Sequence, residues 1–410
     1  MSKNKVSQGI ISRAICACVI IALAIAVMLL RQHSFLSPET INSDNSEPSG
    51  PVQNIPSEII SPDPIPSPEP EISEPDLPDI SLDNYDLDYE LPINGASGFS
   101  LISMGLRETP DENSNAITTI QPGYAFKIIS AQDNWWYVYY DGMSGWVDNT
   151  FCMINLPDII PSIIYVNTNS TSSVLRSSGY DLPGITGERL YNARAFSHRF
   201  GEEQYIMPVL YQTAGRIHNA QQTALENGDS LKIYETFRPW DVQVNIRSTL
   251  QALMNDNAAV HNGINTGGWR MSWFISTSVS THQMGAAVDA SLVRIIDYEV
   301  RTTGGYAYKV ITSYEDYPMP TTVHELSAQA VVLRHGVQWN RTTGWGNVPF
   351  ADTMTEGAKA LHYIFVNAGF IPLASEWWHF DDMDARNAIR GRGINGNFHI
   401  KNSASEEPNT

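Results

Sequence analysis

Residues 280–289 read STHQMGAAVD, and we expect this stretch to set the fold of the second half of the chain. The imidazole of His282 and the carboxylate of Asp289 are both good zinc ligands. Gly285, between them, permits a tight turn of the backbone. The Ala-Ala-Val sequence of residues 286–288 predicts a short buried strand that delivers Asp289 to a site.

A second segment, EWWH at residues 376–379, supplies what the first lacks. His379 offers another imidazole, and two histidines with one carboxylate leave the fourth zinc position open for water, as in catalytic zinc sites. Glu376 is then free to accept the proton of that water. Trp377 and Trp378 predict bulky, dry walls beside the site, and ordinary core packing is the alternative interpretation of these two side chains.

These segments, S-x-H-x-x-G-x-A-x-D at 280–289 and S-E-W-W-H at 375–379, resemble the two signatures of the zinc D-alanyl-D-alanine dipeptidase and carboxypeptidase family. A strand ending in Arg-Pro at residues 238–239 resembles a third family element, and the resemblance covers roughly residues 160–398. It implies a Zn2+ cofactor and a role for Arg238 in holding the scissile carbonyl or its oxyanion. The implied site residues are Glu376 and Arg238 as catalytic groups and His282, Asp289 and His379 as metal ligands.

Two departures from the family pattern concern the substrate more than the zinc. Residues 290–292 are Ala-Ser-Leu, where the family often has Leu-Thr-Leu. More than fifty residues separate Asp289 from the GNVPF segment at 346–350, which is longer than a minimal dipeptidase needs. We expect this insertion to rebuild the substrate cleft.

The N-terminal segment predicts a membrane anchor. Residues 14–30 are an uninterrupted run of 17 uncharged, mainly apolar residues, close to the ~20 that span a bilayer. Positive charges lie in residues 1–13 and the chain after the run is acidic, so we expect a cytoplasmic N-terminus, a single transmembrane helix over 14–31 and extracellular C-terminal domains. A cleaved signal peptide is the alternative, but no small-x-small cleavage site follows the run.

Residues 32–92 predict a disordered linker. They hold 12 Pro, 14 acidic residues and no Lys or Arg, which accounts for most of the net charge of −19. Such a composition buries too little apolar surface to fold and stays extended. Its charge also argues against nucleic acid or anionic lipid as a partner.

Residues 93–156 predict a small all-β barrel that resembles a bacterial SH3 domain, with β-rich runs at 117–120, 125–129 and 135–140 and a turn at Asp141-Gly142. That family commonly binds cell-wall peptides through an aromatic groove. Trp135, Tyr137 and Trp146 could line such a groove, but core packing is the favoured interpretation for each.

Residues 157–398 predict an α+β catalytic domain, a small antiparallel sheet flanked by helices, and residues 399–410 a disordered tail. The expected helices are 207–227, 241–254 with Asp241 as N-cap, and 353–367 opened by a Thr353/Glu356 capping box; the expected strands include 231–234 and 370–373. Cys152 is the only cysteine outside the predicted span. We expect it to be a buried small hydrophobe, because no histidine lies in a recognisable partner motif near it.

Together these features favour peptidoglycan peptides as partners. The doubled tryptophan is closer to the dipeptidase branch, whereas an outward-facing enzyme on a long tether favours a carboxypeptidase that trims stem peptides. A peptidoglycan endopeptidase is the second enzymatic interpretation. A catalytically silent wall-binding protein is the alternative of a different class, and the presence of all five site residues speaks against it.

Overall fold

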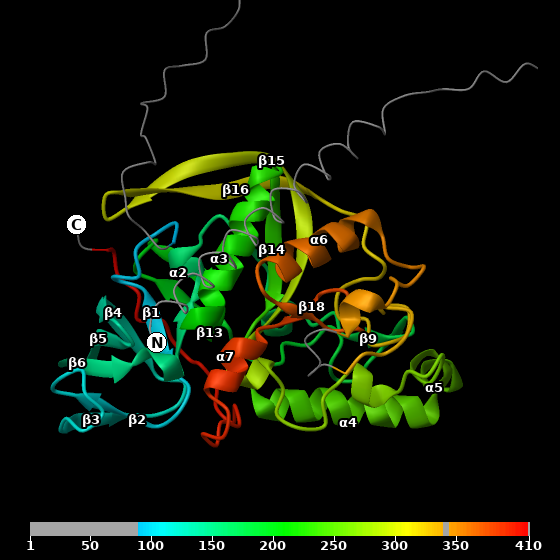
Figure 1. Ribbon diagram of the computed structural model, residues 1–410, viewed down its shortest axis with the longest axis horizontal. Helices are drawn as coiled ribbons and strands as arrows, with labels where there is room; N and C mark the ends of the chain where they lie inside the picture. The colour runs from blue at the N-terminus through cyan, green and yellow to red at the C-terminus, as the bar shows by residue number, and fades with distance from the viewer. Residues whose placement is uncertain (1–88, 339–343, 409–410) are drawn as a thin grey trace, which may run out of the picture. The chain divides into compact units, whose positions relative to one another are not determined.

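The computed structural model describes residues 89–338 and 344–408 (Figure 1). The predicted anchor at 14–31 and residues 32–88 of the predicted linker lie outside the described residues. Within the described ranges, no helix combines the length and the apolar character that a bilayer crossing needs.

Residues 89–92 correct the predicted end of the linker. Tyr89 and Leu91 are buried, and the Leu91 N–H donates to the Ile159 carbonyl at 3.1 Å. The Glu90 carboxylate accepts from the Ser162 N–H at 3.0 Å. Because burying two large apolar side chains is favourable, residues 89–92 belong to the folded unit.

The first sheet is antiparallel throughout and has the order β13-β7-β1-β4-β5-β6-β2-β3. Its strands are β1 (Ser97–Ser100), β2 (Met104–Arg107), β3 (Ala116–Ile120), β4 (Ala125–Gln132), β5 (Trp135–Tyr140), β6 (Met143–Asp148), β7 (Cys152–Asn155) and β13 (Pro208–Leu210). The predicted Asp141-Gly142 turn joins β5 to β6, with φ of 48° and 81°. Positive φ at both central residues is what a type I′ hairpin requires.

Strand β13 shows that the sheet does not end at the predicted domain boundary of residue 156. Pro208 pairs with Asn155 and Leu210 with Met153, so the following domain adds an edge strand to β7. The helical spacing of residues 207–227 predicts a helix here and does not indicate this pairing. The helix α3 instead begins at Tyr211.

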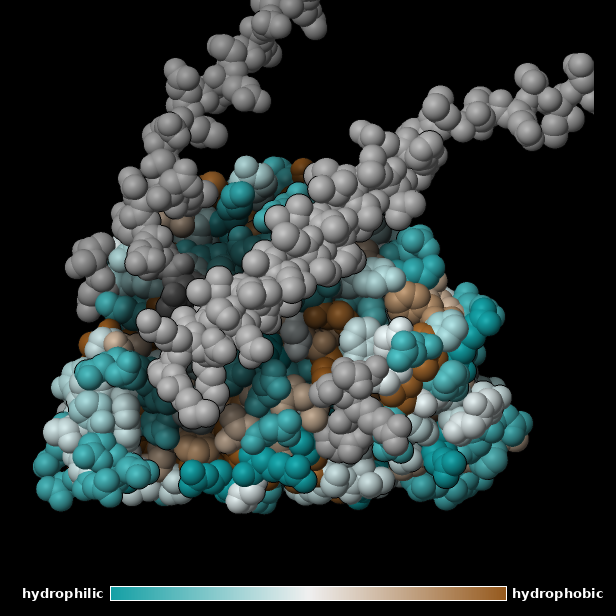
Figure 2. Space-filling model, in the orientation of Figure 1, coloured by the Kyte–Doolittle hydropathy of each residue, from teal (hydrophilic) through white to brown (hydrophobic). Residues whose placement is uncertain are grey.

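The alternation of side chains along β5 decides which aromatic residues enter the core. Trp136 is fully buried, and its ring packs edge-on against Tyr211 with centroids 4.9 Å apart. Trp135, Tyr137 and Trp146 are half-buried instead, which corrects the favoured core interpretation. Successive side chains point to opposite faces of a strand, so placing Trp136 inside turns its two neighbours outward. The surface of this region visible at lower left in Figure 2 is mainly hydrophilic.

The second sheet has the order β17-β18-β15-β14-β8, with β16 paired to β15. Its strands are β8 (Ile164–Tyr165), β14 (Asp229–Glu235), β15 (Ala287–Thr303), β16 (Tyr306–Asp316), β17 (Ile371–Pro372) and β18 (His379–Asp381). Only the β8–β14 pair is parallel. The predicted, mostly antiparallel sheet is therefore present.

Three long helices occur close to the predicted positions: α3 (Tyr211–Glu226), α4 (Trp240–Asp256) and α6 (Glu356–Asn367). Phe365 of α6 stacks on Phe380 of β18 with ring centroids 4.1 Å apart, which packs this helix against the second sheet. The N-caps differ from the prediction. Pro239 precedes α4 in place of Asp241, and the Thr355 hydroxyl accepts from the Ala358 N–H at the start of α6.

The described unit also contains shorter helices and strand pairs, besides several 3-10 segments. These helices and strand pairs are α2 (Leu156–Ile159), α5 (Ala258–Ile264), α7 (Met383–Ala388), the strand pair β9 (Arg176–Ser177) and β10 (Tyr180–Asp181), and the strand pair β11 (Arg194–Ser197) and β12 (Glu202–Tyr205).

The insertion after Asp289 has two parts. The first is the long β15–β16 hairpin at the top of Figure 1, and the hydroxyl of Thr303 at its far end donates to the Arg199 carbonyl at 2.6 Å. None of the described hairpin residues from Ile295 to Asp316 lines the site cavity described below, so this part corrects the expectation of a rebuilt cleft. The second part, after residue 316, brings His324 and Leu326 into the lining of the cavity, so the insertion contributes to the cleft there.

The C-terminal residues 399–408 correct the predicted disordered tail. The Ala404 N–H donates to the Ser97 hydroxyl at 3.0 Å, and the Glu406 N–H donates to the Gly95 carbonyl at 2.8 Å. Ile400 is buried. The reason is steric fit: Gly95 leaves room for the tail, since an added Cβ would lie 2.5 Å from the Glu406 carbonyl oxygen.

Removing residues 397–410 is therefore expected to destabilise the folded unit. Loss of the buried Ile400 side chain alone removes contacts of the kind that cost about 2–5 kcal/mol. Thermal unfolding of the shortened chain should begin at a lower temperature than that of a control lacking only residues 409–410. Equal midpoints for the two chains would contradict the packing of this tail.

Candidate metal centre

Gly285 creates the turn that separates the first two candidate ligands. His282 lies in a short 3-10 segment, and Gly285 ends it with φ of 67°, a left-handed conformation that suits glycine. The Ala286 N–H then returns to the Thr281 carbonyl at 3.0 Å, and β15 begins at Ala287. The predicted tight backbone is confirmed, and the predicted short strand is the buried start of the 17-residue strand β15.

The register of the second sheet brings the other candidate ligand to Asp289. Strands β15 and β18 are antiparallel, and Asp289 pairs directly with His379. Segments ninety residues apart in sequence thus present a carboxylate and an imidazole side by side.

Three donor atoms converge at this point. His379 Nδ1 lies 2.9 Å from Asp289 Oδ1 and 3.1 Å from His282 Nε2. His282 Nε2 lies 3.4 Å from the same Asp289 oxygen. Ligand bonds of about 2.0–2.2 Å place neighbouring donors of tetrahedral zinc about 3.4 Å apart, so the spacing fits a zinc ion closely.

The outer nitrogen of each imidazole has an acceptor of its own. His282 Nδ1 lies 2.5 Å from the Thr236 carbonyl oxygen, and His379 Nε2 lies 2.9 Å from Asp381 Oδ1. Both outer nitrogens therefore carry the proton in the neutral tautomers that this network assigns, as is usual for histidines that bind metals. The inner nitrogens then face a carboxylate oxygen with lone pairs only, and a cation satisfies all three.

Without a metal, a proton must fill this place. Burial by itself lowers the pKa of His379, but the carboxylates of Asp381 and Asp289 outweigh it and raise the pKa well above the usual range. The site therefore attracts positive charge, which is the electrostatic condition for binding a dication.

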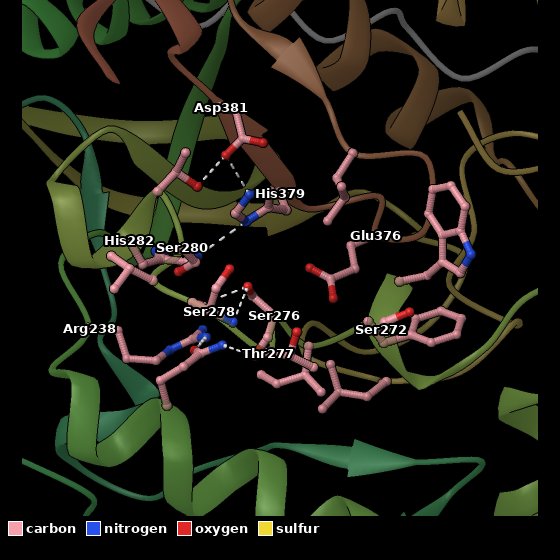
Figure 3. Close-up of a pocket in the computed structure, with 18 of the residues that line it drawn as sticks. Arg238, Ser272, Ser276, Thr277, Ser278, Ser280, His282, Glu376, His379 and Asp381 are labelled. Atoms are coloured by element: carbon pink, nitrogen blue, oxygen red, sulfur yellow. Dashed lines mark hydrogen bonds and ion pairs between the residues drawn. The ribbon is translucent and has the colours of Figure 1, made fainter. Parts of the chain in front are cut away.

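Glu376 is placed differently from the three donors. It lies in the loop before β18 and lines the same cavity as His282 and His379. Figure 3 shows its carboxylate pointing into the cavity from the side opposite the two histidines. Burial raises the pKa of Glu376 to about 8. A carboxylate with a pKa near the working pH suits a group that takes and returns a proton.

This raised pKa gives a pH-dependent stability that can be tested without metal. The pKa of Glu376 is about 8 when folded and 4.5 when unperturbed, so its stabilising protonation is complete below about pH 4.5 and is lost as the pH rises through 8. The metal-free Glu376→Gln variant cannot ionise there. Its thermal midpoint should rise relative to that of the metal-free wild type between about pH 5 and pH 8, and a constant difference over this range would contradict the burial of the acid.

Arg238 follows β14 and is buried at the edge of the cavity. Its Nε donates to Glu235 Oε2 at 2.8 Å, and its Nη1 donates to Gln243 Oε1 at 2.7 Å. Its Nη2 also bonds Glu235 and lies 3.5 Å from Asp289 Oδ2. These bonds fix the guanidinium and leave one hydrogen on Nη1 for a ligand in the cavity.

Sequence reasoning missed three acidic or imidazole residues at this centre: Glu235, His324 and Asp381. The spacing in the sequence could have indicated Asp381, because it lies two residues after His379 on one strand and so on the same face. The sequence contains no comparable signal for His324.

Glu235, Asp289 and His324 form a second cluster of possible metal donors. The Arg238 guanidinium already supplies the positive charge between Glu235 and Asp289, so we interpret this cluster as an ion-pair network.

The cavity is lined by both apolar and hydroxyl-bearing side chains. Trp378 lines it and is 1% exposed, whereas Trp377 is not among the lining residues. The segment 272–281 contributes several serine and threonine residues together with four apolar side chains (Figure 3). Such a lining supplies hydroxyl donors and acceptors for a peptide backbone.

Cys152 takes no part in this centre. It is fully buried in β7, and burial raises the pKa of its thiol well above the usual range. That is the reverse of what a nucleophilic thiolate needs, which confirms the prediction of a small buried hydrophobe.

Comparison with known proteins bears on the first sheet. Residues 103–151 match the family of bacterial SH3 domains. The match includes strands β2 to β6. It confirms the predicted resemblance of this region to a bacterial SH3 domain. No curated protein matches the chain.

Proposed function

We propose that this chain is a zinc-dependent peptidase that hydrolyses D-Ala-D-Ala-type amide bonds in peptidoglycan peptides. The observation that carries the proposal is the convergence of His282, Asp289 and His379 beside the buried acid Glu376 in one cavity. Two histidines and one carboxylate are a donor set of hydrolytic zinc enzymes. The Zn2+ cofactor is part of the proposal.

Each residue has a defined task in the proposed reaction. A bound zinc ion would polarise the scissile carbonyl and acidify the attacking water. Glu376 removes the proton from that water and passes it to the departing amine. The remaining Nη1 hydrogen of Arg238 donates to the oxyanion that forms on the carbonyl. The buried setting of all these groups strengthens their electrostatic interactions.

The substrate class rests on two supports. The sequence segments at 280–289 and 375–379 resemble D-Ala-D-Ala dipeptidases and carboxypeptidases, and a bacterial SH3 domain belongs to the same folded unit. We further propose that residues 14–31 anchor the protein in the cell membrane with the enzyme outside, where stem peptides of the wall are within reach. Nucleic acid is not a proposed partner.

The experiment uses the full chain, purified in detergent and loaded with zinc. It is incubated with D-Ala-D-Ala, with a stem pentapeptide and with intact crosslinked peptidoglycan, and the products are read by mass spectrometry. Loss of one terminal alanine from the pentapeptide supports a carboxypeptidase, and cleavage of the dipeptide alone supports a dipeptidase. Internal fragments would replace this proposal with an endopeptidase. If zinc is bound and no substrate gives a product, the remaining interpretation is a catalytically silent wall-binding protein.

A further inference from the structure

The two oxygens of Asp289 have separate surroundings. Oδ1 faces the inner nitrogens of His379 and His282, at 2.9 and 3.4 Å. Oδ2 faces away from them and lies 3.0 Å from His324 Nε2 and 3.5 Å from Arg238 Nη2. The carboxylate is thus divided between the candidate metal and a second pair of side chains.

His324 is held firmly in this position. Its side chain is 1% exposed, and its ring packs edge-on against Trp378 with centroids 6.0 Å apart. Its backbone carbonyl accepts from the Arg176 N–H at 3.1 Å, and the Leu326 N–H donates to the Arg176 carbonyl at 2.7 Å. These bonds attach the loop that carries His324 to β9.

The backbone of His324 also adopts an uncommon conformation. Its φ is 64°, in the left-handed region that residues other than glycine rarely occupy. Such a conformation persists only where the surroundings enforce it, and it occurs often at functional sites. Here the enforced turn aims the imidazole at Asp289.

The hydrogen-bond network shows which nitrogen of the His324 ring donates to Asp289. A carboxylate oxygen only accepts, so the Nε2 atom of His324 must carry the hydrogen that Asp289 Oδ2 receives. His324 Nδ1 is buried and has no partner among the described residues. His324 therefore acts as a hydrogen-bond donor to Asp289 through Nε2.

We propose that His324 is a positioning residue that holds Asp289 Oδ2 and so directs only Oδ1 to the zinc ion. This rests on the proposed zinc site and adds a residue outside both sequence signatures. Loss of its hydrogen bond would free the carboxylate to rotate and to bind the metal through either oxygen or both. Comparable partners of metal ligands contribute about 10–100-fold in metal affinity.

The test compares zinc dissociation constants, measured by competition with a chromophoric chelator, for the full-length wild type and for the His324→Ala and His324→Gln variants. Both replacements place a non-glycine residue in the same left-handed backbone conformation. The two variants therefore differ mainly in whether the side chain can donate a hydrogen bond. We expect the alanine variant to bind zinc about 10–100-fold more weakly and the glutamine variant, whose amide N–H replaces the imidazole N–H, to recover most of the loss. The visible spectrum of the cobalt-substituted protein should change in the alanine variant and return toward wild type in the glutamine variant.

The matched control is His362→Ala. His362 is also a buried histidine with an unpartnered Nδ1 in the described unit, but it lies on α6 against Trp345 and Phe350. Its removal should leave zinc affinity unchanged. If the wild type binds zinc and folded His324→Ala binds it equally well, this inference fails and the proposed function stands. If His324→Ala does not fold, the glutamine variant decides, and a cobalt spectrum and zinc affinity unlike wild type in folded His324→Gln would overturn the inference. A wild type that binds no zinc overturns both proposals.

Discussion

Replacing Glu376 by glutamine should lower peptide turnover by about 10²–10⁴-fold while zinc binding persists. Glutamine keeps the size and the hydrogen-bonding ability of the side chain but cannot take a proton from water. Glu376 is not among the three converging donors, so its amide leaves the ligand set intact. The change therefore separates proton transfer from metal binding.

Two measurements on the Glu376→Gln protein check this expectation. Zinc content after dialysis should equal that of the wild type, and the initial rate of alanine release from the pentapeptide should be nearly lost. Glu356→Gln makes the same chemical change at an exposed position on α6 and should retain the wild-type rate. A Glu376→Gln rate within about threefold of wild type would remove Glu376 from the role of base.

Replacing His282 by alanine should abolish both zinc binding and hydrolysis. The variant loses one of three donors, and the remaining pair lacks the geometry of a zinc site. Zinc that binds only the folded chain stabilises it by about 4 kcal/mol at a thousandfold excess over the dissociation constant. The wild type should therefore unfold at a higher temperature with zinc than with a chelator, and the variant should show no such difference.

Differential scanning calorimetry with and without zinc measures this effect directly. His261→Ala serves as the control, since His261 is an exposed histidine on α5 away from the cavity. That control should keep the full zinc-dependent shift. A zinc-dependent shift of wild-type size in His282→Ala would show that the metal binds elsewhere.

Local sequence patterns were sufficient to predict several elements of the second domain, some of which carry the site. Gly285 indicated the turn, residues 286–288 indicated the strand, and the helical spacing near residues 210–224 indicated most of α3. Apolar periodicity and a positive-φ glycine act within a few residues. Such patterns can be recognised without any knowledge of how the rest of the chain folds.

Long-range pairing could not be predicted in the same way. The attachment of β13 to β7, the packing of the tail on Gly95 and the approach of His324 to Asp289 all depend on which surfaces meet after folding. The sequence of each segment has no periodic pattern that identifies the segment with which it pairs. The N-cap of α6 at Thr355 shows the same limit at short range, because Thr353 with Glu356 satisfies the capping-box pattern and Thr355 does not.

The β13–β7 pairing also has a consequence for biosynthesis. A ribosome finishes the bacterial SH3 domain more than fifty residues before it reaches residues 208–210, and the tail partners of Ser97 come last of all. Until then β7 presents an unpaired edge, which is open to pairing with other chains. A product that ends before residue 208 keeps that edge exposed. Closure of the sheet next to the bacterial SH3 domain therefore requires a strand that the second domain supplies.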